Sequence, residues 1–136
     1  MLCNEQLVEK CFVKDNELIL KIKIEKLREI VKIAQEAGLN KLLTINVVDL
    51  PRTKTFLLIY TLSSLSSRDL VHIKVAVPRD RPVVPSISDI YLEADYFERE
   101  CHEMFGIVFE GNSECRGTFF LDKSIEGLFP LRKDRA

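Results

Sequence analysis

The sequence predicts an α+β fold, a two-layer sandwich in which two main helices pack on a mostly antiparallel sheet and an extended C-terminal tail follows. Three observations predict it: strand-like segments follow one another along most of the chain, two segments have helical periodicity, and the last stretch has neither pattern. The length of 136 residues is typical of a single domain. We therefore expect one domain over 1–136, with an α/β core at 1–86, a helix and strand at 87–111 and the tail at 112–136.

A β-hairpin and a helix are the first elements predicted. Residues 11–23 (CFVKDNELILKIK) indicate two strands joined by a turn at Asp15 and Asn16, because short polar side chains favour turns. Residues 23–38 (KIEKLREIVKIAQEAG) place apolar side chains at helical spacing. Gly38 is a natural C-terminal cap for this helix.

Three strands are predicted next, at 42–50, 54–64 and 70–78. The third alternates apolar side chains with His72 and Lys74, which predicts a sheet with one buried face. Its apolar positions are Val71, Ile73, Val75 and Val77. The following RDRPVVPS segment, with two prolines, is expected to break regular structure.

The second helix is predicted over about 94–105. On a helical wheel its apolar side contains Ala94, Phe97, Cys101, Met104 and Phe105. Arg99 and Glu103 lie roughly opposite, and Glu98 and Glu100 flank the apolar stripe. Periodicity alone therefore indicates a solvated, charged helix face. The IVFEG segment after Gly106 indicates a short strand or extended stretch.

Charge and composition exclude some classes of protein. Twenty basic and 21 acidic residues leave a formal net charge of -1, which does not favour nucleic acid as a partner. There is no apolar run near 18 residues, so we expect no transmembrane helix, and the N-terminus is too polar for a signal peptide. Without an export signal, the four widely spaced cysteines are most simply reduced thiols in a cytoplasmic protein.

No catalytic, cofactor-binding or metal-binding residues are predicted. Neither a CxxC nor an HxxxH pair is present, and the adjacent Cys101 and His102 diverge by about 100° on a helix. Cys101 instead fits a buried thiol. His72 and His102 have no nucleophile placed beside them by spacing, and Glu98 and Glu100 project from different sides of the helix. A stand-alone zinc or redox protein that uses Cys101, His102 and Cys115 is kept as a rival.

The end of the chain, GLFPLRKD at 127–134, surrounds a proline with apolar side chains and then alternates charges. Regular structure cannot cover such apolar groups. The segment must fold back on its own domain or bind another protein.

Two blocks of the sequence resemble a known family. They are SDIYLEADYFERECHEMFGIVFEG at 88–111 and the closing Gly127 with FPLRKD at 129–134. Both are similar to the C-terminal signature of the NADH dehydrogenase C-subunit family, the 30 kDa subunit of respiratory complex I. Small subunits of energy-converting membrane-bound NiFe hydrogenases also belong to it. The sequence departs from the family pattern at Asn112-Ser113, where His-Pro is common, and at Leu128, an additional residue. The compact size is more like the hydrogenase branch.

The resemblance implies a subunit without a cofactor of its own, which is structural rather than catalytic. It would dock on the large, NiFe hydrogenase-like (49 kDa-type) subunit in the peripheral arm, beside iron-sulfur subunits. It would reach the membrane, on the cytoplasmic side, only through partner subunits. The expected assembly is a membrane-bound NiFe hydrogenase, and the alternative is a complex I-like NADH, F420H2 or ferredoxin:quinone oxidoreductase. Residues 112–136 become a docking tail in this interpretation. The implied partner-binding residues are Glu98, Arg99, Glu100, Glu103, Phe105, Gly106, Arg116, Phe129, Pro130, Leu131, Arg132, Lys133 and Asp134.

Overall fold

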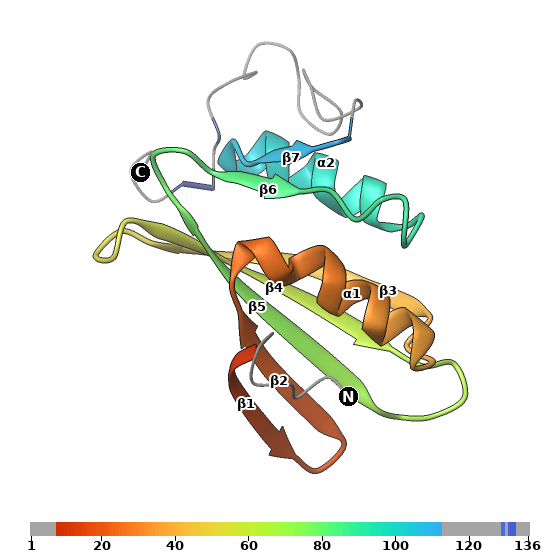
Figure 1. The fold of residues 1–136 in the computed structure, drawn as a ribbon. Helices are drawn as coiled ribbons and strands as arrows, with labels where there is room; N and C mark the ends of the chain where they lie inside the picture. The colour runs from red at the N-terminus through yellow and green to blue at the C-terminus, as the bar shows by residue number, and fades with distance from the viewer. Residues whose placement is uncertain (1–7, 113–128, 130, 133–136) are drawn as a thin grey trace.

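A computed structural model describes residues 8–112, 129 and 131–132 of the chain. Its main element is a five-stranded sheet with the strand order β1-β2-β5-β4-β3. The elements in chain order are β1 (Val8–Lys14), β2 (Glu17–Ile22), the 3₁₀ turn η1 (Ile24–Lys26), α1 (Leu27–Glu36), β3 (Lys41–Leu50), β4 (Thr55–Ser63), β5 (Leu70–Pro78), β6 (Val83–Pro85), α2 (Ala94–Phe105) and β7 (Val108–Glu110). The predicted α+β class is confirmed (Figure 1).

The pairing of the strands is mostly antiparallel, as expected. β1 pairs with β2, β4 with β5 and β3 with β4 in antiparallel register, whereas β2 and β5 run parallel. The parallel pair arises because α1, β3 and β4 intervene between β2 and β5 along the chain. The hairpin turns at Asp15 with a φ of 53°, a left-handed conformation that aspartate tolerates better than most residues.

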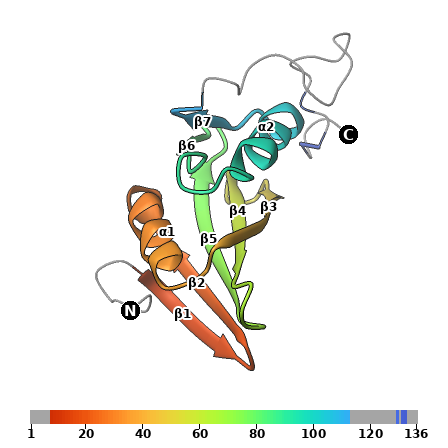
Figure 2. The ribbon, with the colours of Figure 1, turned by 90° about the vertical axis from the view of Figure 1, so that its right-hand side faces the viewer.

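One face of the sheet is buried under the helices. The four apolar residues of β5 that alternate with His72 and Lys74 are all buried, which confirms the predicted alternation. They pack with Phe56, Leu58, Tyr60 and Leu62 of β4 and with Leu27, Ile30, Val31 and Ala34 of α1. Figure 1 shows α1 crossing the sheet in front of β4 and β5, and Figure 2 shows α2 close to β3 at the other end of the layer.

The end of α1 has the hydrogen bonds of a Schellman motif. Gly38 has a φ of 101°, and its N–H donates to the carbonyl of Gln35 at 3.1 Å. The N–H of Leu39 donates to the carbonyl of Ala34 at 3.0 Å. A left-handed residue at this position favours glycine, so the sequence-based prediction of a cap at Gly38 is confirmed.

The RDRPVVPS segment is more regular than expected. Val83–Pro85 forms β6, which pairs in parallel with β7 through Val83 and Val108. The N–H of Val108 donates to the carbonyl of Pro82 at 2.8 Å, and the N–H of Ser86 donates to the carbonyl of Glu110 at 2.8 Å. The expectation of a complete break was wrong because the prolines shorten the strand without preventing a pairing with a distant segment.

The structure also bears on the expectations about membrane-spanning helices and about the cysteines. Within the described residues, no helix is long and apolar enough to span a membrane. Cys11 is disulfide-bonded in the structure, which contradicts the expectation of a reduced thiol at that residue.

Candidate partner-binding surface

Helix α2 lies against β3 and is anchored to it through its apolar side. The thiol of Cys101 is 3% exposed, and its S–H lies 3.6 Å from the carbonyl oxygen of Ile45. This contact agrees with the prediction of a buried thiol at Cys101. The helix ends at Gly106, whose φ of 80° and N–H bond to the carbonyl of His102 form a left-handed cap. His102 Nδ1 lies 2.9 Å from the carbonyl oxygen of Ile107, which ties the cap to the next segment.

The buried carboxylate of Glu98 accepts three hydrogen bonds and so connects a network of polar groups. Its Oε1 accepts hydrogen bonds from the Ser86 hydroxyl at 2.7 Å and the Asn112 side-chain amide at 2.9 Å. Its Oε2 accepts one from the backbone N–H of Ile87 at 2.9 Å. Glu98 thus joins α2 to the segments on both sides of it, and burial without such partners would be costly.

Burial changes the acid–base behaviour of this network. Desolvation raises the pKa of Glu98 above its usual value, although the hydrogen bonds from Ile87, Ser86 and Asn112 oppose the rise. Burial, together with the nearby Glu98 carboxylate, also raises the pKa of Tyr60 well above its ordinary range. The phenol of Tyr60 therefore stays protonated at neutral pH.

The structure corrects the prediction from the helical wheel that the charged side chains of α2 form a solvated face. Glu98 is 0% exposed and Glu103 is 5% exposed, so neither belongs to a solvated face. Phe97 and Phe105 are partly buried against the core, as the wheel expected. Arg99 forms an ion pair with Asp95 on the preceding turn, with Nη1 and Oδ2 3.6 Å apart. The wheel failed at Glu98 because segments before and after α2 cover a flank of the helix that the sheet does not reach.

An ion pair braces α1 against the segment that leads into α2. Both Nη atoms of Arg28 donate to the carboxylate of Asp89, at 2.8 and 2.7 Å, and Nη1 also donates to the carbonyl of Ser86 at 2.6 Å. The hydrogen bonds from Arg28 lower the pKa of Asp89 to about 2. Ser86 is thus held from one side by Arg28 and from the other by Glu98.

The described residues of the tail fold back onto the C-terminal end of α2. The ring of Phe129 lies against Gly106. The N–H of Leu131 donates to the carbonyl of Met104 at 3.0 Å, and Arg132 Nε donates to the carbonyl of Phe105 at 2.7 Å. These bonds satisfy two carbonyls at the helix end that have no partner within the helix.

Phe56 of β4 connects the tail to the core. Its ring packs edge-on against Phe105, with the ring centroids 5.7 Å apart. The guanidinium carbon of Arg132 lies 5.2 Å from the centroid of the Phe56 ring, and that of Arg79 lies 5.7 Å from it. Arg79 also binds Asp49 through two hydrogen bonds, at 2.7 and 2.8 Å. Among the described residues, the guanidinium groups of Arg79 and Arg132 therefore both lie at this ring, and Asp49 is paired with Arg79.

A groove of about 310 Å³ opens between β3 and α2, and we call it the β3–α2 groove. It is lined by Ile45, Asn46, Val47, Glu100, Cys101, Met104, Phe105 and Leu131. Leu131 at its border is 55% exposed, and Tyr96, one turn before Glu100 on α2, is 51% exposed. The groove therefore has mainly apolar walls, with the polar side chains of Asn46 and Glu100 among them.

The structure brings part of the predicted partner-binding set together. Glu100, Phe105 and Leu131 line the β3–α2 groove, while Gly106, Phe129 and Arg132 meet directly beside its end. Glu98 and Glu103 are buried and hold the fold instead. Tyr96 and Met104 lie one turn from Glu100 on α2 but were not in the predicted set, although their spacing of four residues from Glu100 could have indicated them. Four predicted residues lie outside the described part of the chain: Arg116, Pro130, Lys133 and Asp134.

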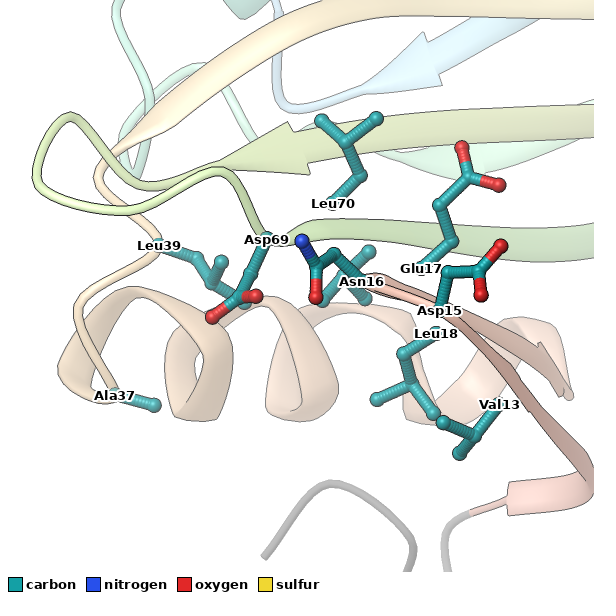
Figure 3. Close-up of a pocket in the computed structure, with 10 residues that line it drawn as sticks. Val13, Asp15, Asn16, Glu17, Leu18, Ala37, Leu39, Asp69 and Leu70 are labelled. Atoms are coloured by element: carbon teal, nitrogen blue, oxygen red, sulfur yellow. The ribbon is translucent and has the colours of Figure 1, made fainter.

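A second hollow, of about 600 Å³, lies at the far end of the sheet, between the β1–β2 hairpin and the end of α1 (Figure 3). Its walls are mainly apolar, and Asp15, Glu17 and Asp69 are its acidic lining residues. Figure 3 shows the carboxylates of Asp15 and Glu17 pointing away from that of Asp69. Across the described residues, no group of three histidine, cysteine or acidic side chains is placed to hold a metal ion.

His72, the other histidine considered for catalysis, lies on the open face of the sheet. Its Nδ1 is 3.0 Å from the hydroxyl of Thr61, and its Nε2 is 3.3 Å from a carboxylate oxygen of Glu17. These contacts bridge three neighbouring strands, β2, β5 and β4, and thus tie the sheet together.

The fold is that of a small α+β protein, with the β3–α2 groove beside the C-terminal end of α2. The family model described as "Respiratory-chain NADH dehydrogenase, 30 Kd subunit" matches residues 20–136. The chain belongs to this family.

Relatives and solved structures agree with this assignment. The chain is 37% identical to the C subunit of NADH-quinone oxidoreductase from Ruegeria sp. (strain TM1040), over 78% of its own length and 52% of the relative. It is 31% identical to the C subunit of F(420)H(2) dehydrogenase from Methanosarcina mazei, over 68% of its own length and 58% of the relative. It therefore spans about half the length of these curated relatives.

Two solved structures have a similar fold. One is a chain of the membrane-bound sulfane sulfur reductase, an archaeal respiratory membrane complex, with a TM-score of 0.86 and 30% identity over 92% of this chain and 75% of that one. The other is a trypsin-resistant fragment of Nqo5, with a TM-score of 0.67 and 29% identity over 76% of this chain and 89% of the fragment.

Proposed function

We propose that this protein is a non-catalytic structural and assembly subunit of a membrane-bound, complex I-like respiratory complex. In this role it docks on the catalytic large subunit of the peripheral arm through the β3–α2 groove and the tail. It is held at the membrane, on the cytoplasmic side, only through its partner subunits.

The observation that carries the proposal is the meeting in space of the two sequence blocks that mark the family. The helix ends at Phe105 and the second block begins only at Gly127, yet Leu131 and Arg132 bond to the carbonyls of Met104 and Phe105. The surface that results combines exposed apolar side chains, Tyr96 and Leu131, with the partly exposed charges of Arg99 and Glu100. Aromatic and apolar anchors with a charged rim are typical of protein interfaces.

Two kinds of complex are candidates for the assembly. Similarity to subunits of NADH-quinone oxidoreductase and F(420)H(2) dehydrogenase supports a complex I-like dehydrogenase. The higher TM-score with the archaeal sulfane sulfur reductase supports a membrane-bound complex of another type. A NiFe hydrogenase is the narrower hypothesis within the same family. Nickel-binding cysteine pairs in the co-purified large subunit would decide for the hydrogenase.

Charge reversal in the groove tests the docking. Glu100→Arg changes a partly exposed side chain that lines the groove, so the fold should survive while the partner is lost. A tagged variant is purified from its host membranes, and the retained subunits are quantified by mass spectrometry. We expect the large subunit to fall at least about tenfold, since like-charge contacts in an interface cost several kcal/mol.

The matched control is Glu29→Arg, which makes the same change at an exposed position of α1 away from the groove. This variant should retain the large subunit at the wild-type level. Equal retention by both variants, with intact folding, would contradict docking through the β3–α2 groove. Equal loss from both would point to a general effect of charge rather than to this surface.

A further inference from the structure

We propose that Arg132 is a preformed binding fork for a carboxylate side chain of the partner subunit. The inference rests on the docking proposed above and specifies its chemistry: an aspartate or glutamate of the partner binds the terminal nitrogens of this arginine.

Two aromatic rings and one hydrogen bond hold the guanidinium of Arg132 in place. Its carbon lies 5.2 Å from the ring centroid of Phe56 and 5.3 Å from that of Phe129, distances at which a cation is attracted to an aromatic ring. The Nε–H is fixed by the bond to the carbonyl of Phe105 at 2.7 Å. A side chain that is already ordered loses little conformational entropy when a ligand binds.

The remaining donors of this group are available to a ligand. An arginine carries five N–H donors, and the bond to Phe105 uses the one on Nε. The described part of the chain offers no acceptor to the four N–H groups on the Nη atoms, and Arg132 is only partly buried, so a partner can reach them. Two parallel N–H groups match the two oxygens of a carboxylate, which makes a bidentate ion pair the natural ligand.

Local charge also favours an anion. The other guanidinium at the Phe56 ring, that of Arg79, is already paired with Asp49 through two hydrogen bonds. Among the described residues, no carboxylate is hydrogen-bonded or ion-paired to the guanidinium of Arg132. Its backbone neighbour Leu131 borders the β3–α2 groove, so a carboxylate at Arg132 lies next to a partner segment seated in that groove.

Arg132→Lys is the decisive variant because it keeps the charge and removes the planar fork. The control is Arg81→Lys, the same change at an exposed arginine in the loop before β6. Thermal unfolding is measured for each variant, so that a loss of packing on Phe56 and Phe129 is detected separately. In the tagged purification, we expect Arg132→Lys to retain at least about tenfold less large subunit than wild type and Arg81→Lys to retain the wild-type amount.

The acidic partner residue is identified by cross-linking in the assembled complex. The photoreactive amino acid p-benzoylphenylalanine replaces Leu131, and the cross-linked peptide is sequenced. We expect a peptide of the large subunit that contains an aspartate or glutamate. A charge swap, with Arg132→Glu in this chain and that acid changed to arginine in the partner, should restore assembly that either change alone abolishes.

The outcomes separate this inference from the docking proposal. If Glu100→Arg releases the partner but folded Arg132→Lys retains it, docking stands and the carboxylate fork is wrong. If the cross-linked peptide has no acid, or if the charge swap restores nothing, the fork is likewise overturned. If Glu100→Arg retains the partner, the docking surface itself fails.

Discussion

The ring of Phe129 lies so close to Gly106 that a Cβ placed on the glycine would come within 2.9 Å of the ring atom Cε2. Gly106 also has a φ of 80°, a conformation that side chains other than glycine rarely adopt. The end of α2 therefore requires glycine for two independent reasons. One reason is local to the backbone, and the other is the return of the tail.

Replacing Gly106 and Gly38 in turn should separate the stability cost of backbone strain from that of crowding against Phe129. Gly106→Ala should lower the free energy of unfolding, measured by urea denaturation, by about 1 kcal/mol for the backbone strain and by about 1–2 kcal/mol more for the crowding against Phe129. Gly38→Ala is the matched control, because Gly38 has a φ of 101° but no atom within 4 Å of the added Cβ. If both variants lose the same stability, the packing of Phe129 on Gly106 contributes nothing.

The buried carboxylate of Glu98 should make stability depend on pH. Its pKa is raised in the folded protein by burial, so the folded state holds this proton more tightly than the unfolded state does. The contribution of Glu98 is therefore most favourable below its ordinary pKa and declines as the pH rises through the higher folded value. Urea unfolding of wild type and Glu98→Gln across pH 4–8 measures this contribution.

We expect the wild type to be more stable than Glu98→Gln by about 1 kcal/mol at low pH, because a protonated carboxyl can donate to the Ser86 hydroxyl while its other oxygen accepts from Ile87. The amide nitrogen of glutamine would instead face an N–H donor, that of Ile87 or Asn112. The advantage should shrink as the pH rises. An advantage that grows with pH would mean that the hydrogen bonds outweigh burial and that the pKa of Glu98 is lowered. Glu110→Gln, at an exposed position of β7, is the control.

The ion pair of Arg28 and Asp89 should show the opposite dependence. The pKa of Asp89 is lowered to about 2, so its stabilisation is present above its ordinary value of 3.8 and disappears as the pH falls through 2. Because both side chains are substantially exposed, solvent screens the pair, and Asp89→Asn should cost at most about 1 kcal/mol at pH 7. Unfolding by urea at pH 7 and between pH 4 and 2 measures the difference.

Asp80→Asn is the control for this pair, since Asp80 is exposed in the loop after β5. It should not change the stability at any of these pH values. A cost for Asp89→Asn that persists unchanged at pH 2 would show that the pair does not lower the pKa of Asp89.

Much of the architecture was predictable from local pattern. The alternation in β5 identified its buried residues, and the bounds of α2 followed from helical spacing and Gly106. The pattern failed for β6, whose partner β7 begins 23 positions after the end of the strand, because no local period reports such a pairing. For the surface, the sequence blocks predicted a shared set of partner-binding residues, but not that Glu98 is buried while Arg132 is only partly buried.

The sequence by itself determined the α+β class, the helix that ends at Gly106 and the family, because periodicity, capping residues and motifs are written along the chain. Only the tertiary structure decided which side chains of the Glu98-Arg99-Glu100 triplet are buried and which are accessible. Glu98 is buried because Ser86, Ile87 and Asn112 converge on it, whereas Glu100 faces the β3–α2 groove. Burial depends on which distant segments cover a helix face, and that coverage arises when the chain packs.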